Sequence, residues 1–519
     1  MQQALLTCAL LLACAIAAFV PPPCGADSGT RRLLAELGDE LKRKEGAITF
    51  PVYHRSLQNG EYKKAPGQAR STLDISDSMA APAPNQINGS NPSNTDMKST
   101  IVTLNEPFGQ YFAIFDIGTP AIDIAVIIDT GSQLLWIQCQ PCIRCGVQAE
   151  GYEIFTPNKS ASFSFLRCVT EAECPGDESV ATTCESNGLC FYHVTYGDKS
   201  NSSGYLSKET LSVGTAHPGA SASQHKDLVF GCGYINTGIE SQLNASGLMG
   251  LDRGPFSLVT QLDVDVFAHC LPNRIHSAKV SGYLTLGPSP LTSNVTLTYT
   301  PMIQNNASPF LSQFYYINMT GVSVDGRRLL NIPSSAFDIT PDGDAGGTII
   351  DSGTTLTSFV EEAFSVIADA FHLAVDSSLS KAETDNSDLL CYGVPLRQRE
   401  APKAPNVTLH FANDLDLNLN TDHLFRLYGR DTTNNYYCMA FNNAGPISSG
   451  GRNFIGNFQQ QNFLVEYDIA NSRIGFAPHI CDQGSSDASS GISISAHSIN
   501  WLLSWQNLWV ISALCGLIL

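Results

Sequence analysis

Basic side chains are scarce in this sequence. Its 519 residues include 29 lysines and arginines against 48 aspartates and glutamates, which gives a formal net charge of −19 at pH 7. The acidic excess lies in residues 101–519, whereas residues 31–70 carry a small positive balance. Because a protein that binds nucleic-acid phosphates needs a basic face, we expect no nucleic-acid partner. An acidic body suits an acidic environment, in which its carboxylates are protonated and repel one another less.

Several enzyme signatures are also missing. The chain contains no G-x-S-x-G, no H-E-x-x-H and no phosphate-binding loop. It therefore offers no support for a serine hydrolase, a zinc peptidase of that type or a nucleotide-binding enzyme. We expect no cofactor.

Runs with helical periodicity are rare, and residues 359–375 (FVEEAFSVIADAFHLAV) form the clearest candidate helix. Short β-branched and aromatic runs, broken by Gly, Asn, Asp and Pro, are common instead. Examples are YFAIFDIG at 111–118, FYYINMTGVSV at 314–324 and NFLVEYDI at 462–469. We predict an all-β body with two domains, residues 101–300 and 301–481.

The N-terminal end has the composition of a secretory leader. Residues 4–20 are apolar, and small-residue cleavage sites lie at Ala17 and Ala26, which predicts a signal peptide over residues 1–26. The segment MQQ lacks the usual Lys or Arg, but no basic stop-transfer flank follows, so a signal anchor is the weaker alternative. Residues 27–100 are expected to be a prosegment, basic at first, and then a linker rich in Ser, Pro, Asn and Ala.

The C-terminal end combines a polar spacer with an apolar tail over residues 482–519. Small residues around Ser485–Gly491, a spacer and a terminal apolar run are typical of a glycosylphosphatidylinositol (GPI) signal. Such a signal would leave the protein on the outer face of the plasma membrane. A spanning helix and a retained amphipathic tail are the alternatives, and without any membrane attachment the protein would be secreted or lie in the cell wall.

Twelve of the sixteen cysteines lie between Cys139 and Cys481. An even set behind a signal peptide predicts six disulfides. Zinc binding at Cys139-x-x-Cys142-x-x-Cys145 is the alternative, but no His pair follows at ligand spacing, so we expect no metal. A secretory route also fits seven candidate glycosylation sites. These are Asn158, Asn201, Asn244, Asn294, Asn306, Asn318 and Asn406.

One phrase occurs twice, as IIDTGS at residues 127–132 and as IIDSGT at residues 349–354. Each copy leaves an apolar run and enters a Gly-containing turn, and the two copies carry Asp129 and Asp351. Each is followed by an apolar-apolar-Gly segment, GLMGL at 247–251 and NFIGN at 453–457. An ordinary structural turn would explain one such motif. Two similar halves that each supply one carboxylate explain the repeat better.

Two carboxylates about 3 Å apart cannot both ionise readily, so they share a proton and titrate as a coupled pair. Such a pair can hold a water and act as base and acid toward a carbonyl group, which is peptide hydrolysis without a metal. Glycosidases also use paired carboxylates, but they do not require duplicated turns of this kind. The residues expected to support the pair are Thr130, Gly131, Ser132, Ser352, Gly353 and Thr354.

At these residues the sequence resembles the pepsin-like aspartic peptidases, and within them the nepenthesin-type plant enzymes. The likeness extends over residues 101–481 and includes the segments LLWIQCQPCIRC, FGCG, RGPFSLVTQL and FIGNFQQQNFLVEYD. It implies a bilobal fold with the active site between pseudo-two-fold related lobes, and a monomeric zymogen that cleaves peptide or protein substrates. It also implies that Trp136 hydrogen-bonds Tyr196, which together with Gly197 lies on a hairpin flap over the substrate. The rival hypothesis is a non-catalytic binding or inhibitor protein on the same fold.

The resemblance further suggests a set of disulfide pairs: 139–142, 145–232, 168–190, 174–184, 270–481 and 391–438. Two positions depart from the family pattern. Lys199 stands where the flap normally has Gly, and Asp252 stands where a Gly-Arg-Gly segment normally begins. Neither change touches the two aspartates.

Overall fold

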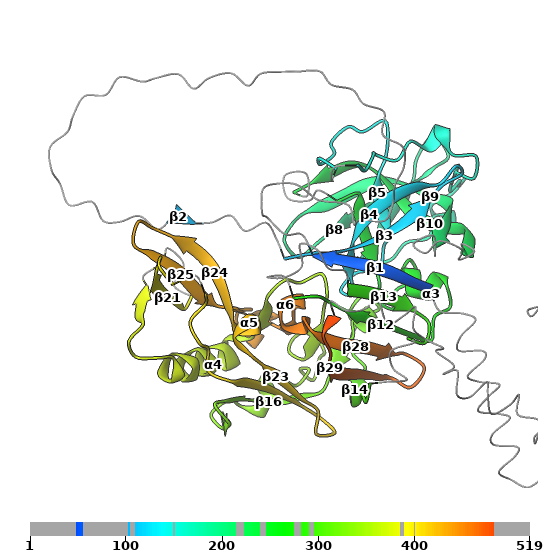
Figure 1. Ribbon diagram of the computed structural model, residues 1–519. Helices are drawn as coiled ribbons and strands as arrows, with labels where there is room; N and C mark the ends of the chain where they lie inside the picture. Colours follow the sequence, from blue (N-terminus) through cyan, green and yellow to red (C-terminus); the bar gives the residue numbers. More distant parts are fainter. Residues whose placement is uncertain are drawn as a thin grey trace, which may run out of the picture. The chain divides into compact units, whose positions relative to one another are not determined.

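The computed structural model describes residues 48–54, 102–103, 109–148, 151–213, 223–238, 245–273, 282–289, 295–382, 384, 389–398 and 400–481. Across these ranges β-strands predominate, in one large sheet and two smaller ones (Figure 1). The predicted signal peptide and the predicted C-terminal signal lie outside the described residues. No helix within the described residues has the length and apolar character needed to cross a bilayer.

Six antiparallel strands form a central layer to which both ends of the body contribute. They pair in the order β1 (Ile48–His54), β13 (Gly282–Leu286), β12 (Val266–Cys270), β28 (Phe463–Asp468), β29 (Arg473–Pro478) and β14 (Thr298–Ile303). Figure 1 shows these strands together in the middle of the body. β1 also pairs with β3, so part of the segment predicted as prosegment is an interior strand of this layer.

The N-terminal lobe continues this layer into a strongly twisted sheet. Its other strands are β3 (Tyr111–Ile117), β4 (Ile122–Asp129), β5 (Trp136–Gln138), β6 (Ser164–Phe165), β7 (Ala181–Cys184), β8 (Cys190–Thr195), β9 (Asn201–Val213), β10 (Ser223–Thr237) and β11 (Gly247–Gly250), with the short helix α3 (Leu258–Gln261). The last six residues of β4 are all buried, because its apolar side chains are covered on both faces of the sheet. The buried strand therefore ends at Asp129.

The C-terminal lobe contains more short strands and the longest described helix. Its strands are β15 (Tyr316–Ile317), β16 (Met319–Val324), β17 (Arg327–Arg328), β18 (Thr348–Ile350), β19 (Thr357–Phe359), β20 (Ser380–Ala382), β21 (Cys391–Pro395), β22 (Val407–Phe411), β23 (Asp416–Leu419), β24 (Phe425–Arg430), β25 (Asn434–Met439), β26 (Phe441–Asn443) and β27 (Asn453–Ile455). Its helices are α4 (Glu361–Ala374), α5 (Thr421–Leu424) and α6 (Asn457–Gln460). β2 (Val102–Thr103) pairs with β24 of this lobe.

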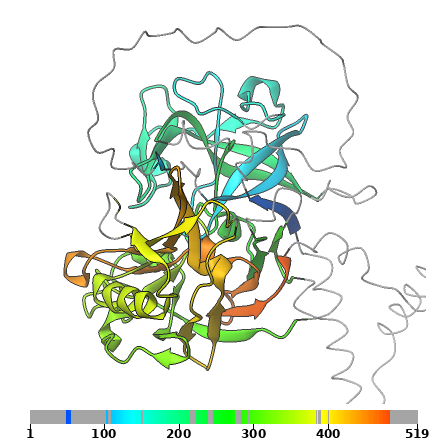
Figure 2. The same cartoon turned by 60° about the vertical axis from the view of Figure 1, so that its left-hand side comes forward.

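The predicted helix at 359–375 is confirmed as α4 (Figure 2). Its buried residues Ala363, Phe364, Ile367 and Phe371 lie on one face, at the spacing that an amphipathic helix requires. Acidic residues in the first turn and His372 in the last turn match the helix dipole. The predicted strands at 111–118, 314–324 and 462–469 correspond to β3, to β15 with β16, and to β28.

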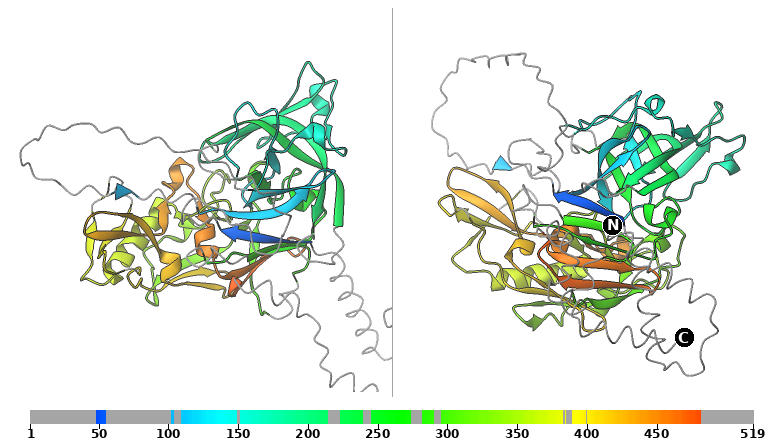
Figure 3. Two further views of the ribbon diagram at one scale, coloured as in Figure 1. Left: turned by 45° about the horizontal axis from the view of Figure 1, so that its top comes forward. Right: turned by 45° about the vertical axis from the view of Figure 1, so that its right-hand side comes forward.

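The two lobes lie on opposite sides of the central layer. In Figure 3 the blue β1 and the orange-red β28 and β29 run between the cyan and green strands of the first lobe and the yellow elements of the second. The predicted division at residue 300 falls inside β14, which begins at Thr298 and pairs with β29 and β15. The strand therefore belongs entirely with the C-terminal part of the chain.

Four of the six suggested disulfide pairs are wrong. The structure forms Cys139–Cys232, Cys142–Cys145, Cys168–Cys184 and Cys174–Cys190, in place of 139–142, 145–232, 168–190 and 174–184. The pairs Cys270–Cys481 and Cys391–Cys438 are formed as suggested. The parallel register of β5 and β10, with Gln138 opposite Gly233, brings Cys139 beside Cys232. That register is a long-range contact, which cysteine spacing does not encode.

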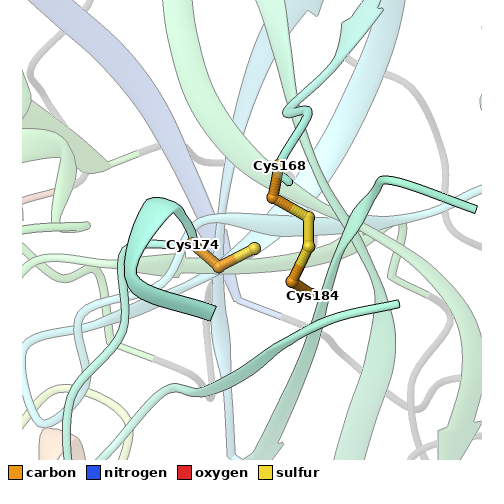
Figure 4. A group of neighbouring side chains, drawn as sticks. All are labelled: Cys168, Cys174 and Cys184. Carbon is orange, nitrogen blue, oxygen red and sulfur yellow. A yellow bond between two sulfur atoms is a disulfide. The ribbon is translucent and has the colours of Figure 1, made fainter. Parts of the chain in front are cut away.

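Three cysteine sulfurs, those of Cys168, Cys174 and Cys184, lie within 4.8 Å of one another, a spacing that would suit a metal ion. Figure 4 shows that Cys168 and Cys184 are joined to each other. Cys174 is joined to Cys190, which the figure does not draw. Because a disulfide sulfur is not a thiolate ligand, the group is a pair of crosslinks.

Five of the seven predicted glycosylation sites lie in the described residues. Asn158, Asn306 and Asn406 are exposed, whereas Asn201 and Asn318 are partly buried. Asn244 and Asn294 lie outside the described ranges.

Candidate active site

The two repeated turns meet in one cleft. Asp129 ends β4, and Asp351 follows β18 directly, so each aspartate leaves a buried strand at its carboxyl end. Both side chains are nearly buried, with 6% and 7% of their surface exposed. Both line a cleft of about 610 Å³. The structure thus brings together two residues that are 222 positions apart in the sequence.

The two carboxylates have matching hydrogen bonds. Each accepts one from the backbone N–H two residues later and one from the hydroxyl group three residues later. The bonds are Gly131 N to Asp129 Oδ1 (2.9 Å), Ser132 Oγ to Asp129 Oδ2 (2.5 Å), Gly353 N to Asp351 Oδ1 (2.7 Å) and Thr354 Oγ1 to Asp351 Oδ2 (2.6 Å). This equivalence makes the site pseudo-symmetric and holds both carboxylates in defined orientations.

Thr130 and Ser352 have a different role from the one predicted. Side chains that support an ionised pair would donate hydrogen bonds to the carboxylates, but these two residues connect the two turns instead. The Thr130 backbone N–H donates to Ser352 Oγ at 3.1 Å, and the Ser352 N–H donates to Thr130 Oγ1 at 2.9 Å. Ser352 Oγ also donates to the carbonyl oxygen of Ile128 at 3.0 Å. These hydrogen bonds connect the two lobes at the residues next to the aspartates.

Each turn glycine lies against the opposite carboxylate. A Cβ added at Gly131 would lie 2.6 Å from Asp351 Oδ2, and one added at Gly353 would lie 2.1 Å from Asp129 Oδ1. Both distances are below contact distance, so the approach of the two turns requires glycine at both positions.

The charge state of the pair follows from burial and proximity. Burial raises the pKa of Asp129 well above its usual value, and the neighbouring negative charge of Asp351 raises it further. Hydrogen bonds from Ser132 and Gly131 oppose the shift without cancelling it. One proton is therefore retained by the pair at a pH where an isolated aspartate would have lost it.

The apolar-apolar-Gly segments support the two aspartates from behind. β11 lies parallel to β4 with Gly250 opposite Asp129, and β27 lies parallel to β18 with Ile455 opposite Ile350. A Cβ at Gly250 would lie 2.2 Å from the backbone of Gln133. The second sequence repeat thus builds the strand beside each aspartate-bearing strand.

The predicted flap is a hairpin of β8 and β9, with Tyr196 beside its tip. Trp136 Nε1 donates to the Tyr196 hydroxyl oxygen at 2.6 Å, which is the contact that the resemblance implied. Tyr196 lines the cleft with Gly197, and Gly197 is exposed. At the tip, Lys199 has a φ of +70°, a left-handed conformation that favours glycine. The departure at Lys199 therefore places a strained residue at the flap turn.

We expect Tyr196→Phe to reduce kcat/KM for peptide cleavage by about tenfold and to lower the melting temperature by only a few degrees. The substitution keeps the ring but leaves the buried indole N–H of Trp136 without its acceptor whenever the flap covers the cleft. Steady-state kinetics and thermal unfolding of both proteins measure the two effects. Tyr196→Ala, which also removes the ring, should be weaker still. Equal falls in activity and stability would instead make Tyr196 a packing residue.

One group of residues beside the cleft gave no signal in the sequence. Asp177 Oδ2 accepts hydrogen bonds from Gln133 Nε2 at 2.7 Å and from Gln313 Nε2 at 2.8 Å. Gln133 belongs to the N-terminal lobe and Gln313 to the C-terminal lobe, so Asp177 joins the two lobes beside the cleft, which Gln133 lines. Its segment is held by the Cys168–Cys184 and Cys174–Cys190 disulfides. The high density of cysteines was the only feature of the sequence that indicated an ordered structure for the segment around Asp177.

A second bridge between the lobes starts from Arg253. Its backbone N–H donates to the Gln313 carbonyl oxygen at 3.1 Å. Its guanidinium donates to the carbonyl oxygens of Ser312 and Phe314, the latter at 3.3 Å. Phe310 and Phe314 then line the cleft on the C-terminal side. Their aromatic character is the one sequence signal that could have suggested contact with substrate.

Known proteins match most of the chain. Residues 111–288 match the family profile described as "Xylanase inhibitor N-terminal", and residues 314–478 match "Xylanase inhibitor C-terminal". The chain is 38% identical over 375 residues to aspartic proteinase nepenthesin-1 of Nepenthes gracilis, covering 72% of this chain and 78% of the relative. It is 34% identical to nepenthesin-2 of the same organism, with 72% and 78% covered. It is also 34% identical to aspartyl protease family protein 2 of Arabidopsis thaliana, with 74% and 73% covered.

Solved structures share the fold at low identity. The crystal structure of edgp superimposes with a TM-score of 0.55 at 18% identity, covering 84% of this chain and 95% of that one. Basic 7S globulin from soybean gives a TM-score of 0.55 at 16% identity, with 85% and 97% covered. The predicted mostly-β, two-lobed fold is thereby confirmed. The chain belongs to the pepsin-like aspartic protease family, in the group that includes the nepenthesins.

Proposed function

We propose that the protein is an aspartic endopeptidase that hydrolyses peptide bonds at acidic pH, with Asp129 and Asp351 as its catalytic pair. One observation carries the proposal: both carboxylates lie in one cleft with equivalent hydrogen bonds to Gly131, Ser132, Gly353 and Thr354. Membership of an aspartic protease family supports the same activity.

The chemistry requires a pair that carries one proton. The ionised carboxylate removes a proton from a water molecule as the water oxygen attacks the substrate carbonyl carbon. The protonated carboxyl donates its proton to the carbonyl oxygen, which gives a neutral tetrahedral intermediate. Collapse of this intermediate breaks the C–N bond. The leaving nitrogen takes a proton from the carboxyl that accepted one from water, and a hydroxyl group of the intermediate returns its proton to the other carboxylate. The pair ends with one proton, as it began.

The cleft suits an extended peptide. Tyr196 on the flap would cover the substrate from one side, while Phe310 and Phe314 offer apolar contact on the other. Gly197 has open space around its Cα, so a neighbouring substrate backbone could approach it closely. The site needs no cofactor and no metal for this reaction.

The second candidate function is inhibition of another enzyme. The two matching family profiles carry the description "xylanase inhibitor", and this description favours an inhibitory function. Both Asp-(Thr/Ser)-Gly turns are present with a full set of hydrogen bonds, which favours catalysis.

We further infer a secretory protein, since six disulfides require an oxidising compartment. We also propose that removal of residues 27–100 activates the enzyme. A GPI anchor would then attach the enzyme to the plasma membrane.

The test is digestion of a peptide library by the purified full chain after acid treatment, between about pH 3 and pH 8. We expect cleavage at acidic pH, inhibition by pepstatin, and a loss of activity as the pH rises past the raised pKa of the pair, because the pair then loses its last proton. No cleavage at any pH, together with inhibition of a xylanase, would favour the second candidate.

A further inference from the structure

A third carboxyl group, that of Asp252, lines the same cleft as Asp129 and Asp351. Its side chain is 2% exposed. Its Oδ1 atom accepts a hydrogen bond from the Gly254 N–H at 2.6 Å. Within the described residues, that N–H is the one hydrogen-bond partner of the carboxyl group. The other oxygen is therefore available to a molecule bound in the cleft.

The groups around Asp252 are mostly acidic or neutral. Burial raises its pKa to about 8, and the charges of Asp177 and Asp351 add to the shift. The Gly254 N–H and Arg253 lower the pKa without reversing that shift. The buried Tyr315 hydroxyl also faces Asp252 and donates to the Leu251 carbonyl oxygen at 2.8 Å.

Among the described residues, no basic side chain forms a hydrogen bond or an ion pair with the Asp252 carboxyl group. The guanidinium of Arg253 donates to the carbonyl oxygens of Ser312 and Phe314. Arg452 is the one basic residue among the described residues that line the cleft. Its guanidinium donates to the carbonyl oxygens of Gly450, at 3.2 Å, and Asp344. Arg253 acts on Asp252 through its charge, but a bound cation would meet no hydrogen-bonded or ion-paired side chain on this carboxyl group.

Asp177 supplies a lasting negative charge beside this carboxyl group. Burial alone would raise the pKa of Asp177, but hydrogen bonds from Gln133, Val180, Gln313 and Ser179 outweigh that effect and lower it. Asp177 therefore stays ionised in mild acid, where Asp252 is protonated in the empty cleft. A cation in contact with Asp252 would gain from the field of Asp177 and would displace the proton of Asp252.

We propose that Asp252, supported by Asp177, selects a basic side chain, lysine or arginine, at one position of the peptide substrate. The inference rests on the proposed peptidase function and adds a residue that determines substrate selectivity. The resemblance places a glycine at position 252, so the selectivity would distinguish this chain from relatives with glycine there.

The experiment compares two peptide series that place lysine or the uncharged norleucine at each position around the cleaved bond. We expect wild-type protein to prefer lysine at one position by about tenfold in kcat/KM. Asp252→Asn, which has almost the same shape, should reduce the preference below about twofold, while cleavage of the norleucine peptide remains. Asp369→Asn, an exposed substitution on α4, is the matched control and should keep the full preference.

The pH dependence of the lysine-to-norleucine ratio provides a second readout without any variant. The general loss of cleavage that follows when the catalytic pair loses its proton affects both peptides and cancels in the ratio. The ratio should rise with pH, because pairing with lysine requires loss of the Asp252 proton. A ratio that is flat with pH, or equal in wild type and Asp252→Asn, would overturn the inference alone. Failure of wild type to cleave either peptide would overturn the proposed function, and the inference with it.

Discussion

Asp129→Asn and Asp351→Asn should each lower peptide cleavage by about a thousandfold or more. The reaction requires one carboxylate to accept a proton and one carboxyl to donate a proton, and an amide can do neither. Both substitutions keep the shape of the side chain, and the single amide oxygen of each can still accept the backbone N–H bond that Oδ1 accepts in wild type. Initial rates with a peptide that wild-type protein cleaves would measure the loss.

Stability serves as the control for the same variants. Because the pKa of Asp129 is raised in the folded protein, its ionisation favours the unfolded chain, and this cost appears as the pH rises above the ordinary aspartate pKa. Asp129→Asn removes the cost, so its melting temperature near pH 7 should equal or exceed that of wild type. Near-normal acid proteolysis by either variant would disprove the mechanism.

Gly353→Ala should abolish most activity by a steric route, with a loss of about a hundredfold or more. The added methyl group would lie 2.1 Å from Asp129 Oδ1, so either the carboxylate or the turn must move. A displacement of about 1 Å in a catalytic group is enough for a loss of that size. Turnover of a standard peptide and binding of pepstatin should both fall.

Gly393→Ala is the matched control for this substitution. Gly393 lies in β21 within the C-terminal lobe, and its added Cβ would lie 3.5 Å from the Tyr436 ring, an ordinary van der Waals contact. Activity of this variant should stay near wild type. If Gly353→Ala were equally active, the close approach of the two turns would not be needed for catalysis.

The pair of aspartates was predictable because its signals are local. An apolar strand followed by Asp-(Thr/Ser)-Gly can be recognised within a few residues, and its repetition indicated two equivalent halves. α4 was predictable for the same reason, since amphipathic spacing is a property of one segment. The roles of Thr130 and Ser352 could not be predicted in this way. Each forms a hydrogen bond to the opposite lobe, and no neighbouring residue in the sequence indicates that partner.

The sequence by itself determined the two aspartates, their turns, the all-β character and the secretory cysteine set, since each depends on residue types within short windows. Only the tertiary structure decided the disulfide pairing around Cys139–Cys190, where the packing of hairpins selects among cysteines at similar spacing. It also decided which polar residues reach the cleft. Asp252 lines the cleft, and Asp177, 75 positions away in the same lobe, lies close enough for its charge to raise the pKa of Asp252. Such contacts depend on the path of the whole chain, and no local pattern records that path.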